Sequence, residues 1–244
     1  VVYVGAQGSA WGDSEERGVY RTTDGGKTWE KILYNNSRTG IADMVMDPSN
    51  PNKIFAAMWE FRRWPWFFKS GGEGSGLYMT LDGGDTWKRL SSEDGLPEGE
   101  LGRIGVAIAP SKPDVVYAHI ESKKNGIYRS EDGGFNWELR QTVEKDGDVG
   151  NRPFYYAEIY VDPFNENRVF SIYTYISKSE DGGKSFESLY PYYNWVHPDH
   201  HALWLSQDDP GFMIDGNDGG LNITYDGGDT WEFIDNIPVG EFYY

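Results

Sequence analysis

The chain has 244 residues, with 39 acidic against 22 basic side chains and a net charge of −17. A negative excess without any basic run argues against nucleic acid and anionic membranes as partners. No stretch approaches the roughly 20 apolar residues of a membrane span. The lack of cysteine excludes disulfides and thiolate chemistry in this chain, but it does not exclude secretion. The length suits one domain, and the glycine and aromatic content is typical of a turn-rich β protein.

The first predicted elements are three strands. Residues 1–6 form an apolar run, and residues 18–21 and 29–32 flank an Asp-Gly-Gly turn that begins at Asp24. Such runs on both sides of this turn are typical of a β-hairpin, in which the glycines adopt positive φ and the aspartate accepts hydrogen bonds from turn amides. The ring that closes the turn, here Trp29, is expected to pack between neighbouring sheets, where its burial contributes about 2–3 kcal/mol.

The same turn recurs four more times along the chain. Its aspartates are 58, 50, 49 and 45 residues apart, and they are Asp24, Asp82, Asp132, Asp181 and Asp226. A period of about 40–50 residues is typical of one four-stranded blade per repeat. The sequence therefore predicts an all-β chain, a β-propeller of four-stranded antiparallel blades.

Each repeat also contains a proline-rich turn upstream of its hairpin, for example at Pro48 and Pro110. This turn separates an inner first strand, such as residues 104–108, from a second strand. One blade is thus predicted as strand A, proline turn, strand B, loop, strand C, Asp-Gly-Gly turn and strand D. We expect one domain over 1–244, with blades at 1–35, 40–92, 101–142, 155–190 and 200–236, and a next or closing strand at 237–244.

Both ends of the chain fall within a blade. Residues 1–6 form a strand B without its strand A, and residues 239–244 form a strand A without its strand B. Either the last strand closes a five-bladed ring, or the chain is a window on a larger propeller with seven or more blades. We expect the window. The exposed edges of an unclosed sheet would also allow homo-oligomers.

All five hairpin turns match the Asp box, S/T-x-D-G-G-x-T-W, so the chain resembles the Asp-box (BNR) repeat proteins over nearly its whole length. These proteins include sialidases, sortilin-like ectodomains and large secreted proteins described as glycosyl hydrolase-like. The resemblance implies that the box aspartates are structural and face away from any active site. It also implies an extracellular or periplasmic location and a polymer-binding role, although the fold alone does not determine function.

Irregular, aromatic-rich insertions are predicted at the opposite end of the blades from the Asp boxes. Loops on a rigid scaffold are where binding groups concentrate, and flat rings stack on sugars or contact peptide side chains. The expected ligand-binding residues are Trp59, Trp64, Trp66, Tyr155, Tyr156, Trp195, His197, His200 and Asn217. The alternative is that the insertion at 59–68 forms a small core of its own, because so many large rings are poorly accommodated in water.

Three of the four histidines lie in the segment His197-Pro198-Asp199-His200-His201, which enters an inner strand near the mouth of the channel. Such a cluster could serve as acid and base, or hold a divalent metal near His197, Asp199 and His200. Adjacent residues on a strand point to opposite faces, so His200 and His201 are not expected to converge on one ion. The structural alternative is hydrogen bonding to loop carbonyls, and no cofactor is predicted.

A second Asp-Gly-Gly run, residues 218–220, lies outside the Asp-box register and is expected beside the histidine segment. It resembles the segment at which two-propeller xyloglucanases place a catalytic carboxylate, which makes Asp218 a catalytic candidate. Those enzymes pair two carboxylates, and the separation is about 6.5–9.5 Å for inversion and about 5–5.5 Å for retention. Glu158 and Glu73 are the candidate partners within this chain. The alternative for Asp218 is a polar turn residue.

Other chemistries have less support in the sequence. A sialidase needs an arginine triad, and Arg62, Arg63, Arg103 and Arg152 do not form one locally. Sortilin-like proteins carry a cysteine-rich module that is missing here. The sequence therefore predicts a secreted propeller that binds a polysaccharide or glycan through its aromatic loop face. Hydrolysis is left open, and an enzyme would be a glycoside hydrolase. The alternative is a non-catalytic scaffold that binds an extracellular protein.

Overall fold

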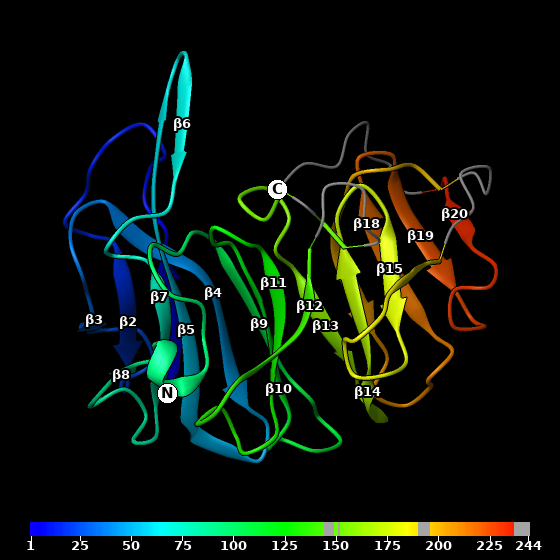
Figure 1. The fold of residues 1–244 in the computed structure, drawn as a ribbon, viewed down its shortest axis with the longest axis horizontal. Coiled ribbons are helices and arrows are strands. Elements are labelled where there is room, and N and C mark those ends of the chain that lie inside the picture. The colour runs from blue at the N-terminus through cyan, green and yellow to red at the C-terminus, as the bar shows by residue number, and fades with distance from the viewer. Residues whose placement is uncertain (144–148, 151, 190–195, 237–244) are drawn as a thin grey trace.

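A computed structural model describes residues 1–143, 149–150, 152–189 and 196–236, in which the chain forms a succession of antiparallel sheets (Figure 1). This arrangement confirms the predicted all-β class. The first sheet has three strands in the described residues, and each later sheet has the four strands of a blade, with one extra strand in the second. No helix in the described residues is long and apolar enough to cross a membrane.

The strands follow the repeat order along the chain. The first sheet contains β1 (Val2–Ala6), β2 (Gly18–Thr22) and β3 (Glu30–Leu33). The second contains β4 (Thr39–Asp47), β5 (Asn50–Trp64), β7 (Gly76–Thr80) and β8 (Lys88–Arg89), with β6 (Phe67–Ser70) paired to β5. A 3-10 turn, η1 (Ser92–Asp94), follows.

The remaining sheets have the same design. The third contains β9 (Ile104–Ile108), β10 (Val116–Ile120), β11 (Gly126–Ser130) and β12 (Glu138–Thr142). The fourth contains β13 (Ile159–Asp162), β14 (Asn165–Ile172), β15 (Ile176–Ser179) and β16 (Glu187–Ser188). The fifth contains β17 (His200–Leu205), β18 (Met213–Asn217), β19 (Gly220–Thr224) and β20 (Glu232–Ile234).

The first strands of the four later sheets, β4, β9, β13 and β17, line a common channel of about 720 Å³. Neighbouring inner strands approach closely. A Cβ atom at Gly105 of β9 would collide with the carbonyl oxygen of Ala157, just before β13, so glycine is required there. The strands alternate in direction, and the two ends of each sheet therefore differ. We call the end with the Asp-Gly-Gly turns the box end and the opposite end the loop end.

Each Asp-Gly-Gly turn is closed by its own aspartate. In the first turn, the carboxylate of Asp24 accepts the backbone N–H groups of Lys27 and Thr28 at 2.9 and 3.0 Å and the Thr28 hydroxyl at 2.7 Å. The hydroxyl of Thr22 donates to the same carboxylate at 2.8 Å. The backbone N–H of Thr28 and these hydroxyls lower the pKa of Asp24 to about 2. The turn is therefore stabilised locally and needs no ligand.

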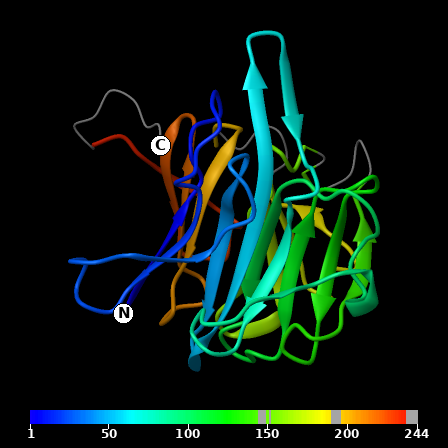
Figure 2. The same ribbon diagram turned by 90° about the vertical axis from the view of Figure 1, so that its left-hand side faces the viewer.

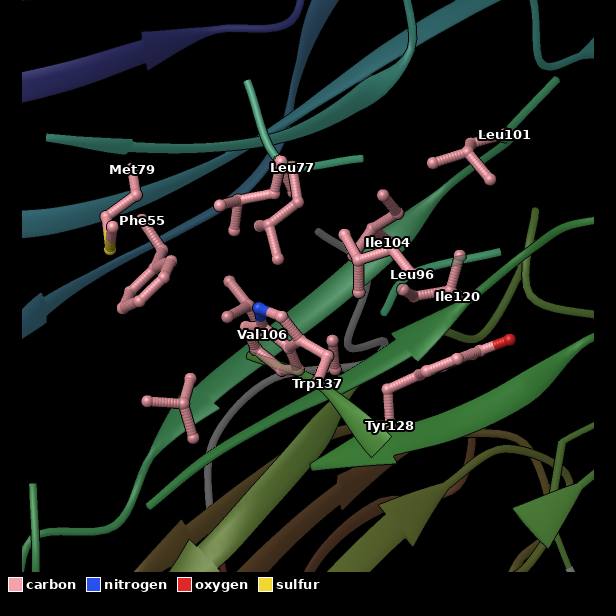
Figure 3. Packing of buried hydrophobic residues seen from close by; sticks show 14 of the residues in the cluster. Phe55, Leu77, Met79, Leu96, Leu101, Ile104, Val106, Ile120, Tyr128 and Trp137 are labelled. Carbon is pink, nitrogen blue, oxygen red and sulfur yellow. The ribbon is translucent and has the colours of Figure 1, made fainter. Parts of the chain in front are cut away.

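The box-end rings contribute to packing between sheets. Trp137 closes the third turn and packs edge-on against Phe55 of β5, with ring centres 6.3 Å apart, in the core between the second and third sheets (Figure 3). Trp29 differs, because it is 44% exposed. The expectation that the first box ring is buried is therefore wrong, because the side chains of Ile32 and Leu33 in β3, rather than the Trp29 ring before it, pack in the core shared with the second sheet.

The insertion after Trp59 is a β-hairpin. β5 continues beyond the sheet and pairs with β6 from Phe61 opposite Ser70 to Trp64 opposite Phe67. This hairpin projects past the loop end of the sheets, as both ribbon views show (Figures 1 and 2). At its base Arg17 is fully buried, lies 4.7 Å from the centre of the Phe61 ring and donates to the carbonyl oxygens of nearby loop residues. The projecting segment is thus anchored to the first two sheets.

Candidate functional site

A row of aromatic rings runs along the loop end from the second sheet to the fifth. Successive ring centres are 6.0, 5.7, 5.8, 5.6 and 5.8 Å apart. We call this set the aromatic row, and its members are Trp59, Phe68, Phe154, Tyr155, Tyr156 and His201. Contacts at these separations are favourable ring–ring interactions. The row joins residues that are far apart in the sequence into one surface.

The rings of the row differ in exposure. The buried rings hold the row in place, and the exposed rings are open to solvent. Trp59 stacks on Phe61 with centres 4.3 Å apart and is buried, as is Tyr156. Tyr155 is 49% exposed and presents its ring to solvent. The base of the insertion at 59–68 forms a small core, as its alternative interpretation expected, while Trp66 and Phe67 at its far end are exposed.

Polar side chains at the end of the row are organised by β17 and β18. The Nδ1 atom of His200 lies 2.8 Å from Asp215, and both side chains are buried. The amide of Asn217 donates to the same carboxylate at 2.7 Å, and its oxygen accepts the backbone N–H of Gly219 at 2.9 Å. This network fixes the turn that carries Asp218. His200 thus helps to hold this turn in place from the buried side.

His201 and Asp218 form the exposed counterpart of that buried pair. The Nε2 atom of His201 lies 2.8 Å from Asp218, and the two side chains are 25% and 39% exposed. The hydroxyl of Tyr156 donates to Asp199 at 2.7 Å, and burial together with this hydrogen bond raises the pKa of Tyr156. Asp199 has a φ of 65°, the one positive value among the described residues other than glycine. Strained backbone of this kind tends to occur at functional sites.

His201 and Asp218 border a pocket of about 560 Å³ at the loop end. Its lining comes from strands of the second and fifth sheets and from segments that connect the strands of the others, and includes Trp59, Tyr155, His201, Asn217 and Asp218. A concave, mostly apolar surface with a few placed polar groups is the usual form of a small-molecule site. Here four rings of the aromatic row supply apolar surface, and Asp218 with His201 supplies hydrogen-bonding groups beside them.

A second group of charges lies deeper, where the pocket meets the channel. Arg103 donates to Glu158 at 2.6 Å and to the carbonyl oxygen of Tyr155 at 2.7 Å. Glu158 lines the channel, and its other oxygen is buried without a hydrogen-bond partner in the described residues. Asp43 accepts the backbone N–H groups of Met44 and Val106, and burial raises its pKa. Arg103 borders both cavities.

The trio considered for a metal does not come together. His197 contacts the carbonyl oxygen of Pro198, Asp199 accepts from Tyr156, and His200 pairs with Asp215. No group of three histidine or carboxylate side chains in the described part of the chain could hold a metal ion.

The other predicted residues are distributed as follows. Trp59, Tyr155, Asn217 and Asp218 line the pocket, whereas Glu158 lines the channel. Trp64 and the 83% exposed Trp66 lie at the far end of the hairpin, outside the pocket lining, and Glu73 is exposed. His197 is exposed beside Gly219, and Trp195 lies outside the described residues.

Sequence reasoning did not select several pocket residues. His201, rather than His200, reaches the pocket, because β17 has an irregular register between His200 and Ala202. Arg63 and Phe154 also line it. Arg63 could have been selected from the sequence, since it follows a predicted strand and belongs to the aromatic insertion. The register irregularity has no signal in the sequence that would have revealed it.

Comparison with known proteins supports the fold. The family model described as BNR/Asp-box repeat matches residues 20–31. No curated protein matches the chain.

The chain is similar to several solved structures at low identity. The GH74 enzyme of Niastella koreensis is 17% identical, with a TM-score of 0.62 over 90% of this chain and 34% of that chain. An ancestral GH74 enzyme is 17% identical, with a TM-score of 0.66 over 97% of this chain and 31% of that chain. YCF48 from Cyanidioschyzon merolae is 16% identical, with a TM-score of 0.51 over 80% and 56%. The chain thus spans about a third of the length of these GH74 enzymes, and the likeness shows the propeller fold.

Proposed function

We propose that this chain, a β-propeller with Asp-box (BNR) repeats, binds a saccharide in the loop-end pocket. The observation that carries the proposal is the aromatic row, which ends beside the His201–Asp218 pair within one pocket. The flat face of a sugar ring is apolar and its rim carries hydroxyl groups. It therefore matches an exposed ring such as Tyr155 next to a carboxylate and an imidazole.

The arrangement supports binding more directly than hydrolysis. Glycoside hydrolysis uses two carboxylates on either side of one bond. Asp218 lines the pocket, but Glu158 lines the channel and is held by Arg103 at 2.6 Å. Asp218 would then act as a hydrogen-bond acceptor for sugar hydroxyls. If hydrolysis occurs, Asp218 is the carboxylate that we assign to it.

The similarity to GH74 enzymes adds a separate line of support for a glycan ligand. One solved structure of similar fold is the GH74 xyloglucanase from Xanthomonas campestris, with 14% identity and a TM-score of 0.52 over 93% of this chain and 41% of that chain. A glycan-binding role would place the protein where polysaccharides occur, in the extracellular space or the periplasm.

A second candidate function is protein binding, favoured by the hairpin tip. Trp66 is 83% exposed and Phe67 57% exposed, on a projecting segment outside the pocket. Exposed tryptophan is common at protein interfaces. This function needs the tip, whereas saccharide binding needs the row, so the two can be separated by mutation.

The proposal is tested by replacing Tyr155 with alanine and measuring saccharide binding by calorimetry on a panel of β-glucan and pectic oligosaccharides. Loss of one stacking ring, worth about 0.5–1.5 kcal/mol, should weaken binding roughly 2- to 10-fold. Tyr155 is half exposed, so the fold should remain intact.

The matched control is Phe164→Ala, which removes a 47% exposed ring from the turn between β13 and β14 at the box end. It should leave binding unchanged. Equal affinities for the parent and Tyr155→Ala, or no binding by the parent, would refute the proposal. Selective loss of a protein partner in Trp66→Ala would favour the second candidate. Reducing-sugar release that disappears in Asp218→Asn would add hydrolysis to binding.

A further inference from the structure

Arg63 is a cation on the pocket wall that has no acidic partner among the described residues. Its guanidinium lies 5.2 Å from the centre of the Phe68 ring, a member of the aromatic row. Its backbone N–H donates to the carbonyl oxygen of Ala10 at 2.8 Å, and this bond fixes the residue against the first sheet's loop. No described residue forms an ion pair or hydrogen bond with its guanidinium. The group is therefore positioned by packing and remains available.

The neighbouring arginines each pair with a carboxylate of the protein. Arg62, the adjacent residue on β5, pairs with Asp13 at 3.0 Å and does not line the pocket. Arg103 pairs with Glu158 at 2.6 Å. In a chain with 39 acidic and 22 basic side chains, an arginine would readily find a carboxylate at the surface. Arg63 instead lies over an aromatic ring at the pocket wall.

Most of the charged side chains that line the pocket are paired, and Arg63 is the exception among the described residues. The lining includes two arginines, Arg63 and Arg103, and one carboxylate, Asp218, which is engaged by His201. The chain as a whole carries a net charge of −17. An uncompensated guanidinium on the pocket wall of an acidic protein creates a local positive potential that attracts an anion.

We propose that the pocket selects an anionic saccharide, and that Arg63 binds its negatively charged group. This inference rests on the saccharide-binding function proposed above and names its ligand class. A guanidinium presents a planar fork of N–H donors that matches a carboxylate or a sulfate group. The sugar ring stacks on the exposed part of the aromatic row, and its acidic substituent points toward the hairpin that carries Arg63.

The test compares saccharides that share one backbone and differ in charge. The probes are oligogalacturonate and its methyl ester, with a sulfated galacto-oligosaccharide as a third arm that separates carboxylate from sulfate. Calorimetry should show tighter binding of at least one anionic probe than of the neutral ester. Arg63→Gln should lower the affinity for that probe by about 10- to 100-fold, the usual range for a charge-assisted hydrogen bond, and leave the ester unaffected.

Arg62→Gln is the matched control, because it changes the net charge equally at the adjacent position but removes a residue that is paired with Asp13 outside the pocket. The affinity of the Arg62→Gln variant for every probe should equal that of the parent protein. If Arg62→Gln and Arg63→Gln weaken anion binding equally, the effect is one of general charge, and the inference is wrong.

The outcomes separate this inference from the function on which it rests. One outcome is that the ester and the anionic probes bind with equal affinity, and that Tyr155→Ala weakens this binding but Arg63→Gln does not. That outcome would overturn anion selection and leave saccharide binding in place. Binding of no saccharide by the parent would overturn both. Preference for an anionic probe that disappears in Arg63→Gln would support both.

Discussion

The two ends of the blades connect antiparallel strands in different ways. At the box end, each aspartate binds the amides and hydroxyls of its own turn, so that both carboxylate oxygens of Asp24 accept hydrogen bonds from within seven residues. At the loop end, His119 of β10 is fully buried with both ring nitrogens lacking a partner in the described structure, and Asp199 is strained. The box aspartate is thus satisfied within its own repeat, whereas His119 has no hydrogen-bond partner in the described structure.

This difference indicates a division of labour. A turn aspartate that bonds within its own turn is committed to the fold, whereas an unpaired cation and exposed rings are available to a ligand. Stability should therefore depend mainly on the box end, and ligand recognition on the loop end. The following changes test that division.

The largest expected effect is on stability and comes from Trp137→Ala. This ring is 6% exposed and packs on Phe55, so its removal should lower the free energy of unfolding by about 3–5 kcal/mol. Trp29→Ala at the equivalent position of the first box is the control, and it should cost about 1 kcal/mol because that ring is 44% exposed. Urea unfolding of both variants measures the difference. Equal losses would contradict the assignment of packing energy to the buried ring.

A smaller effect is expected from His119 and depends on pH. Burial, together with the nearby positive charge of Arg103, lowers the pKa of His119 to about 4. The unfolded chain therefore binds a proton between pH 6.5 and 4 that the folded chain does not, and stability falls as pH decreases through that window, by up to roughly 3 kcal/mol.

The variant His119→Leu should lose this component of the pH dependence, which thermal unfolding from pH 7 to pH 4 would measure. The box aspartates do not contribute much there, since the pKa of Asp24 is about 2 and its stabilisation is lost only as pH falls from about 4 towards that value. An unchanged slope in the variant would show that His119 does not stay neutral on folding.

The smallest of these effects concerns a single hydroxyl at the box end. Ser130 donates to Asp132 and accepts the backbone N–H of Gly134, both at 2.8 Å, and is buried. Ser130→Ala leaves that N–H without an acceptor and should cost about 1–2 kcal/mol. Ser122→Ala in the loop-end turn after β10 removes an exposed hydrogen bond and should change stability by less than about 0.5 kcal/mol. Calorimetry measures the unfolding of both serine variants. A larger loss of stability in Ser122→Ala than in Ser130→Ala would contradict the proposal that stability depends mainly on the box end.

The candidate site was only partly predictable. Asp218 was selected by a motif, and Trp59 and Tyr155 by their place in aromatic insertions, and all three line the pocket. His201 was not selected, because strand alternation fails at the irregular register of β17. The ion pair between Arg103 and Glu158 joins residues 55 positions apart, and no local pattern indicates it.

The sequence by itself determined the repeat, the turn chemistry and the all-β class. These features depend on contacts within a few residues, such as the hydrogen bonds of Asp24 to Lys27 and Thr28 and the positive φ of the glycines between them. The tertiary structure alone decided which side chains share the pocket. Phe68, Tyr155 and His201 become neighbours only when separate sheets pack around one channel, and that proximity is fixed by packing between blades, which no local pattern encodes.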